Sequence, residues 1–148
     1  MIRVHGTSVA LGGDGVLLRG PSGCGKSDLA LRLIDGGARL VADDQTELRL
    51  SGSDVIASPP STIAGQLEVR GVGIVRVPFI GRAPLRLVVD LVPPEAVERM
   101  PEAEFCELLR RPIARLALAP FEASTPAKVR LALAALVRSA RHPISVAS

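Results

Sequence analysis

The chain has 148 residues, of which 47% are hydrophobic and 22% charged, a composition typical of one globular domain. Its formal charge of +3 is spread along the sequence without a basic run, which argues against a groove for nucleic acid. No run of about 18 apolar residues occurs, and polar residues and glycines interrupt the N-terminal stretch before a signal-peptide core could form. We therefore expect a single domain spanning residues 1–148, cytoplasmic, without membrane insertion and with reduced cysteines.

The N-terminal third predicts strands that lead into a loop and a helix. Extended runs are expected at residues 2–5 and 8–11, followed by a glycine turn at 12–15 and a strand at 16–19. A short helix should follow the loop and end at Gly36-Gly37. Its helical spacing is carried by Leu29, Ala30, Leu33 and Ile34.

The rest of the chain is predicted to be rich in strands. The expected strands cover residues 38–42, 46–50, 55–57, 67–70, 73–79, 85–91 and 113–119. Residues 95–111 have a helical pattern that Pro101 interrupts, and residues 125–141 predict an amphipathic helix with Thr125 as its N-cap. These elements indicate an α/β fold with a β-rich mixed sheet and a few helices rather than a regular βαβ alternation.

One motif stands out for its specificity, the phosphate-binding P-loop G-x-x-x-x-G-K-[ST]. Its residues are Gly20, Pro21, Ser22, Gly23, Cys24, Gly25, Lys26 and Ser27. The glycines let backbone N–H groups approach the phosphates, Lys26 reaches the β- and γ-phosphates, and the Ser27 hydroxyl binds Mg²⁺. Lys26 is one of only two lysines in a chain that otherwise uses arginine. The loop predicts binding of a nucleoside triphosphate, with ATP and Mg²⁺ as cofactors.

Acidic residues follow the loop at a spacing that suits phosphoryl transfer. Asp43 and Asp44 end a predicted strand, where an α/β sheet places its chemistry, and could orient a metal and accept a hydroxyl proton. A pair of acids that opens a turn is the alternative. Glu68 shares a strand face with Arg70, which a solvent-facing ion pair would also explain.

Three further residues are ambiguous from the pattern alone. His5 lies on a predicted strand, where a lone histidine is more often a packing or surface residue than a catalyst. Arg99 lies in the helical pattern before Met100-Pro101. Cys24 is an unusual thiol inside a phosphate loop, where the neighbouring cation favours oxidation.

Taken together, three strings resemble the kinase domain of HPr kinase/phosphorylase, the enzyme family that phosphorylates a serine of the phosphocarrier protein HPr. The likeness covers residues 4 to about 121. The strings are the P-loop, Leu40-Val41-Ala42-Asp43-Asp44 and Leu67-Glu68-Val69-Arg70-Gly71-Val72-Gly73-Ile74, the last similar to the family signature L-E-I-R-G-L-G-I. The resemblance implies a P-loop kinase domain of the HPr kinase type, a PEP carboxykinase-like fold.

The resemblance also implies a role for each candidate. Asp44 matches the residue that accepts the serine proton in the kinase direction and returns it in the phosphorylase direction, and Asp43 is its neighbour in the motif. His5 and Arg99 match active-site residues, and Glu68 matches a second Mg²⁺ ligand beside Ser27. The implied partners are HPr or a related phosphocarrier and further copies of this chain, since the family is hexameric.

The chain departs from the family pattern at three places. The separate N-terminal domain of longer members is not expected here, and segment 76–86 is shorter than the family loop. The stretch after Pro120, which contains Gly-Arg-Asn in the family, reads Phe121-Glu122-Ala123-Ser124. That stretch is linked in the family to phosphorylase activity and substrate contact. The sequence therefore supports kinase activity better than phosphorylase activity.

Two other functions stay open from the sequence. A small-molecule or nucleotide kinase would need an arginine-rich lid and a regular parallel sheet, which the β-rich middle of the chain does not supply. A nucleotide-binding regulatory module without catalysis would bind ATP but would not depend on Asp44.

Overall fold

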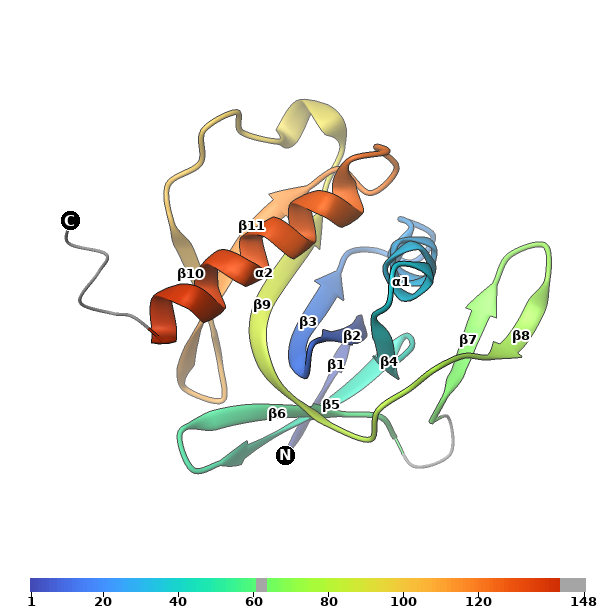
Figure 1. Ribbon diagram of the computed structural model, residues 1–148, viewed down its shortest axis with the longest axis horizontal. Helices are drawn as coiled ribbons and strands as arrows, with labels where there is room; N and C mark the ends of the chain where they lie inside the picture. Colours follow the sequence, from blue (N-terminus) through green and yellow to red (C-terminus); the bar gives the residue numbers. More distant parts are fainter. Residues whose placement is uncertain (61–63, 142–148) are drawn as a thin grey trace.

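A curved mixed sheet dominates the computed structural model, which describes residues 1–60 and 64–141 (Figure 1). Its strand order is β1-β5-β6-β9-β3-β2-β4, with β11 beside β9 and β10 beside β11. The strands are β1 (Ile2–His5), β2 (Thr7–Leu11), β3 (Asp14–Arg19), β4 (Arg39–Ala42), β5 (Gln45–Ser51), β6 (Asp54–Ser58), β9 (Ala83–Leu91), β10 (Glu104–Leu108) and β11 (Arg111–Leu118). A separate hairpin pairs β7 (Gln66–Val69) with β8 (Gly73–Arg76). The predicted β-rich mixed sheet with few helices is confirmed.

Strand β9 joins the two halves of the sheet. Its first residues, Ala83 and Pro84, pair antiparallel with β6. The rest of β9 pairs in parallel with β3 on one side and with β11 on the other. The carboxyl ends of β3, β9 and β11 therefore lie at one edge of the sheet, where open α/β sheets bind their ligands.

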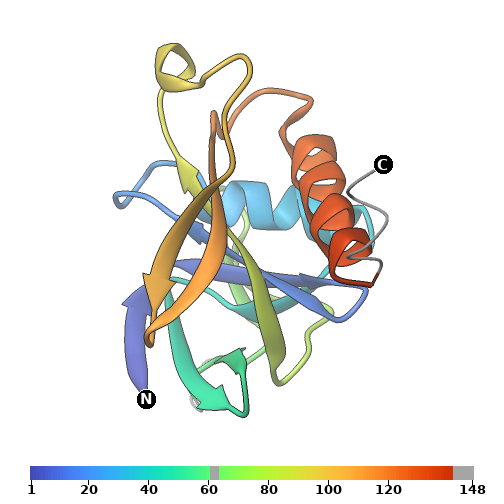
Figure 2. The ribbon, with the colours of Figure 1, turned by 90° about the vertical axis from the view of Figure 1, so that its left-hand side faces the viewer.

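Two helices pack on one face of this sheet, α1 (Lys26–Asp35) and α2 (Thr125–Arg141) (Figure 2). Side chains alternate along β3, so Val16 and Leu18 belong to the core beneath the helices. Leu17 belongs to a second core, which includes residues of the β5–β6 hairpin. Both helices were predicted, and Gly37 ends α1 with a positive φ of 110°.

Three sequence predictions are wrong in detail. Residues 95–111 form a short 3₁₀ turn (Pro94–Ala96), an irregular loop and strand β10, because pairing with β11 satisfies the backbone of Glu104–Leu108. The strand predicted at 73–79 ends at Arg76, since the Val77 amide donates to the Gly65 carbonyl. Thr125 is the first residue of α2, and its hydroxyl donates to the Ala119 carbonyl rather than capping the helix.

Helix length and hydropathy give no membrane-crossing candidate in residues 1–60 and 64–141.

A charged row fixes the carboxyl ends of the parallel strands. Asp90 on β9 accepts hydrogen bonds from Arg19 Nε on β3 at 2.7 Å and from Arg115 Nε on β11 at 2.6 Å. Burial raises the pKa of the Asp90 carboxyl, but the hydrogen bonds from the two arginines outweigh this and leave the pKa below its usual value. Because Arg19 directly precedes Gly20, this row positions the strand end from which the P-loop starts.

We predict that Asp90→Asn lowers the free energy of unfolding at pH 7 by about 1 kcal/mol, a figure reduced for the partial exposure of the group. The lowered pKa of Asp90 means that its contribution is present above its unfolded pKa of 3.8 and is lost as the pH falls through the folded value. Urea denaturation should show a difference in free energy of unfolding between the native chain and the variant at pH 7, and this difference should be smaller at pH 3. Asp54→Asn, which removes an exposed partner of Arg86 at 3.1 Å, is the matched control. A gap of equal size at both pH values would contradict the ion-pair account.

Candidate functional site

The P-loop connects β3 to α1, and its backbone takes conformations that need glycine. Gly23 and Gly25 have φ values of 82° and 105°, in the left-handed region. Helix α1 begins at Lys26, so its first unpaired N–H groups and its positive end point at the loop. The Lys26 ammonium donates to the carbonyls of Gly20 at 2.7 Å and Pro21 at 3.1 Å. This arrangement presents a cation and several amides to an anion.

The buried carboxylate of Asp43 connects three separate elements at this site. Its Oδ1 accepts from the Ser27 hydroxyl at 2.7 Å and from the Thr7 hydroxyl at 3.0 Å. Its Oδ2 accepts from the backbone N–H of Glu68 at 3.0 Å. Asp43 therefore orients the P-loop serine and attaches strand β7 to the site.

The next residue, Asp44, is held in a strained turn that directs it away from the core. Its φ is 67°, a left-handed conformation that aspartate tolerates better than most residues. The Asp44 amide donates to the Thr7 hydroxyl at 3.2 Å, and the Gly6 amide donates to the Asp44 carbonyl at 2.8 Å. These bonds fix the exposed carboxylate, whose Oδ1 lies 3.0 Å from Nε2 of His5 on β1.

The structure brings most of the sequence candidates into this one network. His5 contacts Asp44, and Ser27 contacts Asp43 beside Lys26. Three other candidates sit differently. Glu68 joins the network only through its backbone N–H, which donates to Asp43, while its side chain is exposed. Arg99 is exposed on the loop after β9. The Cys24 sulfur lies 4.0 Å from Lys26 Nζ.

Sequence reasoning missed Thr7, whose hydroxyl bridges both aspartates. Its side chain is fully buried on β2, donates to Asp43 and accepts from the Asp44 amide. A threonine in a strand belongs to no motif, so only the pairing of the strands could reveal this role.

The donor set at the site suits Mg²⁺. The Ser27 hydroxyl and the exposed carboxylate of Glu68, whose backbone N–H donates to Asp43, offer the oxygen atoms that a hard cation prefers. Among the described residues, no cluster of three or more histidine, cysteine, aspartate or glutamate side chains could hold a metal by itself. A magnesium ion that keeps waters and shares its ligands with substrate phosphates needs only one or two such protein groups.

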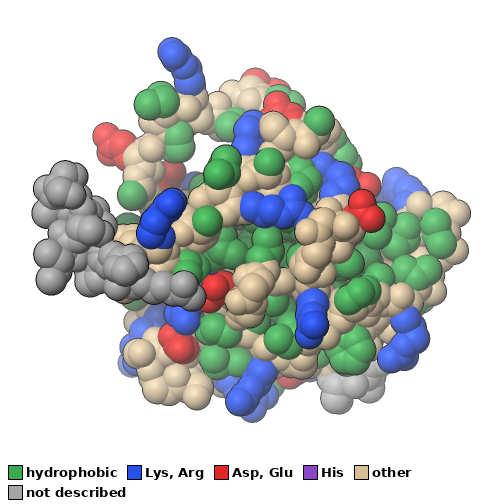
Figure 3. Space-filling view, in the orientation of Figure 1, with side chains coloured by type: hydrophobic (Ala, Val, Ile, Leu, Met, Phe, Trp, Pro, Cys, Tyr) green, Lys and Arg blue, Asp and Glu red, His purple; other side chains and the backbone are tan. Residues whose placement is uncertain are grey.

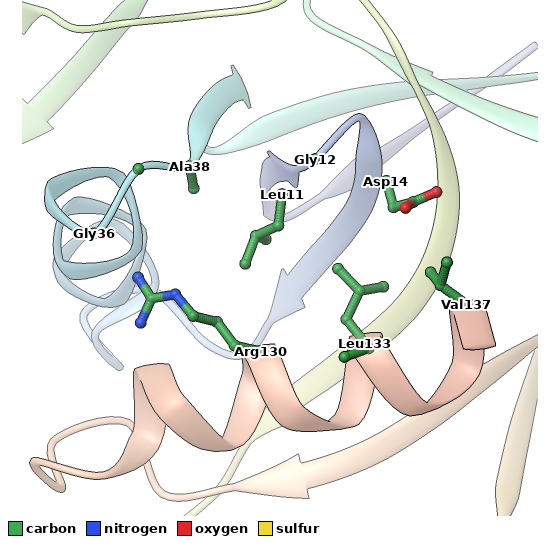
Figure 4. Close-up of a pocket in the computed structure, with 10 residues that line it drawn as sticks. Leu11, Gly12, Asp14, Gly36, Ala38, Arg130, Leu133 and Val137 are labelled. Carbon is green, nitrogen blue, oxygen red and sulfur yellow. The ribbon is translucent and has the colours of Figure 1, made fainter.

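A cavity lies at the other end of α1 and not at the P-loop. Its volume is about 370 Å³, and it opens between the C-terminus of α1, the β2–β3 turn and α2 (Figure 4). Arg130 reaches across it from α2 and donates to the Leu33 carbonyl at 3.3 Å. A phosphate loop binds its ligand with backbone N–H groups on an open surface, so we place the site at the loop and not in this cavity.

We predict that Thr7→Val lowers the free energy of unfolding by about 1–3 kcal/mol, because the buried Asp43 carboxylate and the Asp44 amide each lose a partner. Urea denaturation measures the loss. Thr7→Ser keeps the hydroxyl and should recover most of the stability. A loss in Thr7→Ser with little or none in Thr7→Val, which keeps the methyl group, would mean that Thr7 acts through packing of that methyl group and not through the hydrogen bonds.

Comparison with known proteins gives sequence relatives for the part of the chain that carries the site. The chain is 48% identical over 75 residues to HPr kinase/phosphorylase of Clostridium botulinum (strain Eklund 17B / Type B) and 49% identical over 78 residues to that of Clostridium tetani (strain Massachusetts / E88). These matches cover 51% and 53% of this chain. The matched part spans about a quarter of the length of each of these relatives, 25% and 26%.

A solved structure and a family model extend the likeness. The structure of the HPr(Ser) kinase/phosphatase from Coxiella burnetii superposes with a TM-score of 0.81 at 26% identity, covering 98% of this chain and 99% of that one. The model of the HPr serine kinase C-terminal domain matches residues 1–97, which include the P-loop, both aspartates and β7. The chain therefore belongs to the HPr serine kinase C-terminal domain family.

Proposed function

We propose that this domain transfers the γ-phosphate of ATP to a serine of the phosphocarrier protein HPr or of a related phosphocarrier. The observation that carries the proposal is the hydrogen-bonded link from the P-loop serine through Asp43 to the turn that presents Asp44. This link couples a triphosphate site to an exposed carboxylate that an incoming hydroxyl can reach. The names of the relatives supply the class of substrate.

The phosphates would be bound by the loop amides, the positive end of α1 and Lys26. Lys26 is 6% exposed and held at the loop, so its charge can be offered to the β- and γ-phosphates with little reorganisation. Ser27 and Glu68 would hold Mg²⁺, with Asp43 orienting the Ser27 hydroxyl. When bound, Mg²⁺ supplies charge neutralisation across the transferred phosphate.

Asp44 would act as the general base. Its carboxylate accepts the proton of the substrate serine as the serine oxygen attacks the γ-phosphorus and ADP leaves. His5, 3.0 Å away, would fix the orientation of this carboxylate. In the reverse direction the same group would protonate the departing serine oxygen while inorganic phosphate accepts the phosphoryl group.

The family resemblance implies three further features of this domain. Arg99 would contribute to the active site from the loop that follows β9, which begins at the edge of the sheet where β3 meets the P-loop. Phosphorylase activity depends on a stretch that reads Phe121-Glu122-Ala123-Ser124 here. Assembly into a hexamer follows from the family resemblance, and the mass of the native particle by light scattering would test it.

Two features of the chain support a proposal about its cellular setting. Cys24 and Cys106 are free thiols, which suits the reducing cytoplasm. Lys and Arg side chains are scattered over the face seen in Figure 3 and form no stripe on it, which disfavours a nucleic acid partner. We therefore propose a cytoplasmic protein kinase domain whose macromolecular partner is a protein.

The proposal predicts serine labelling of purified phosphocarriers when the native chain is given ATP labelled in the γ-phosphate and Mg²⁺. Asp44→Asn should reduce transfer by about a hundredfold or more, because the attacking hydroxyl loses its base, while ATP binding persists. Lys26→Ala should reduce both binding and transfer. Glu107→Gln, an exposed change on β10, is the control.

Two other results would identify the rival functions. Transfer from ATP to a small metabolite, with none to any phosphocarrier, would establish a metabolite kinase. ATP binding without transfer to any acceptor, unchanged by Asp44→Asn, would establish a regulatory nucleotide-binding module.

A further inference from the structure

An aromatic ring lies directly against the phosphate loop. Phe121 follows β11, and its ring packs on Gly25 so closely that a methyl group added to this glycine would lie 2.8 Å from Cζ and 2.9 Å from Cε1 of the ring. The sequence holds only three phenylalanines and no tryptophan or tyrosine. Phe121 therefore brings one of very few aromatic rings to the residue that precedes the phosphate lysine.

The segment that carries Phe121 is attached to α1 and is not a free loop. Arg32 on α1 donates to the carbonyls of both neighbours of Phe121, to Pro120 and, at 3.3 Å, to Glu122. The same guanidinium donates from Nε to Asp28 at 3.0 Å, one turn earlier on the helix. The arginine thus fixes the backbone on both sides of the ring relative to the first turn of α1.

The ring nevertheless keeps most of its surface in water. Phe121 is 68% exposed although its edge touches Gly25, so much of the ring can still accept a flat partner. Leaving a large apolar side chain exposed forgoes the free energy that its burial would provide. A planar base stacked on the ring would recover part of that free energy.

The position of the ring fits the nucleoside end of a bound nucleotide. Figure 1 shows α1 between the β7–β8 hairpin and the segment that leads into α2. The Asp43 carboxylate accepts the backbone N–H of Glu68 on the β7 side, where the terminal phosphate and its metal would lie. The nucleoside must leave the loop in another direction, and Phe121 lies on the α2 side beside the first turn of α1.

We propose that Phe121 is a stacking platform for the base of the bound nucleotide, held in place by Arg32. This inference rests on the proposed binding of a nucleoside triphosphate at the P-loop and adds the residue that recognises its base. Stacking uses the π-face that every base has, so the platform favours a nucleoside triphosphate over a bare polyphosphate without requiring hydrogen bonds to the base.

Calorimetric titration of the native chain and Phe121→Ala with MgATP and with magnesium tripolyphosphate tests the proposal. Phe121→Ala should weaken ATP binding about tenfold, the loss typical of one base–aromatic contact, and should leave tripolyphosphate binding unchanged. Phe105→Ala is the matched control, since Phe105 is 64% exposed on β10 and pairs with the middle of β11. It should change neither affinity.

A fluorescence experiment provides a second readout that does not depend on truncation of the ring. Phe121→Trp gives the chain a single tryptophan and no tyrosine background. Its emission should be quenched by MgATP and not by magnesium tripolyphosphate, while Phe105→Trp should respond to neither.

The remaining outcomes distinguish failure of the stacking role of Phe121 from failure of the proposed nucleotide binding at the P-loop. Equal changes in ATP and tripolyphosphate affinity on Phe121→Ala, no change in either, or tighter binding would overturn the stacking role and leave the P-loop function intact. Tighter binding would mean that the ring blocks the loop. A native chain that binds neither ligand would overturn the proposed function and the stacking role with it.

Discussion

The site depends on one buried carboxylate. Asp43 accepts hydrogen bonds from the P-loop serine, from a threonine on β2 and from the backbone of β7, so three elements far apart in sequence are held at fixed distances. A carboxyl group that is only 8% exposed is tolerated because donors occupy both of its oxygens. The hydroxyl of Ser27 is oriented by this bond, and the turn that follows Asp43 places Asp44 at the surface.

The two aspartates have different roles because their environments differ. Asp43 faces the interior and positions other groups, whereas the left-handed turn at Asp44 exposes a carboxylate next to His5. The strain of that turn is compensated by Thr7 and Gly6, whose bonds hold the Asp44 backbone. On the other side of α1, Arg32 fixes the segment that carries Phe121, so the loop is bordered by an acidic side and an aromatic side.

Local chemistry was readable from the sequence, and long-range pairing was not. The P-loop, its flanking strand and helix, and the glycine stop of α1 follow from residue types at fixed spacing, which the structure reproduces. Residues 104–111 carry helical spacing, yet Glu104–Leu108 pairs with β11, because the neighbouring strand satisfies the backbone better than an isolated helical turn. Thr7 and Phe121 act through contacts with residues far away in sequence, which no local pattern encodes.

The coupling between Ser27 and Asp43 is the central claim, and a double-mutant cycle on MgATP affinity tests it most directly. Calorimetric titration would compare the native chain, Ser27→Ala, Asp43→Ala and the double variant, with circular dichroism confirming the fold of each. If Asp43 acts through the serine hydroxyl, the loss of binding free energy in the double variant should be smaller than the sum of the two single losses, with a coupling energy of about 1 kcal/mol or more. A loss of binding free energy in the double variant equal to the sum of the two single losses would contradict the account, because it would mean that the two residues act on the nucleotide independently.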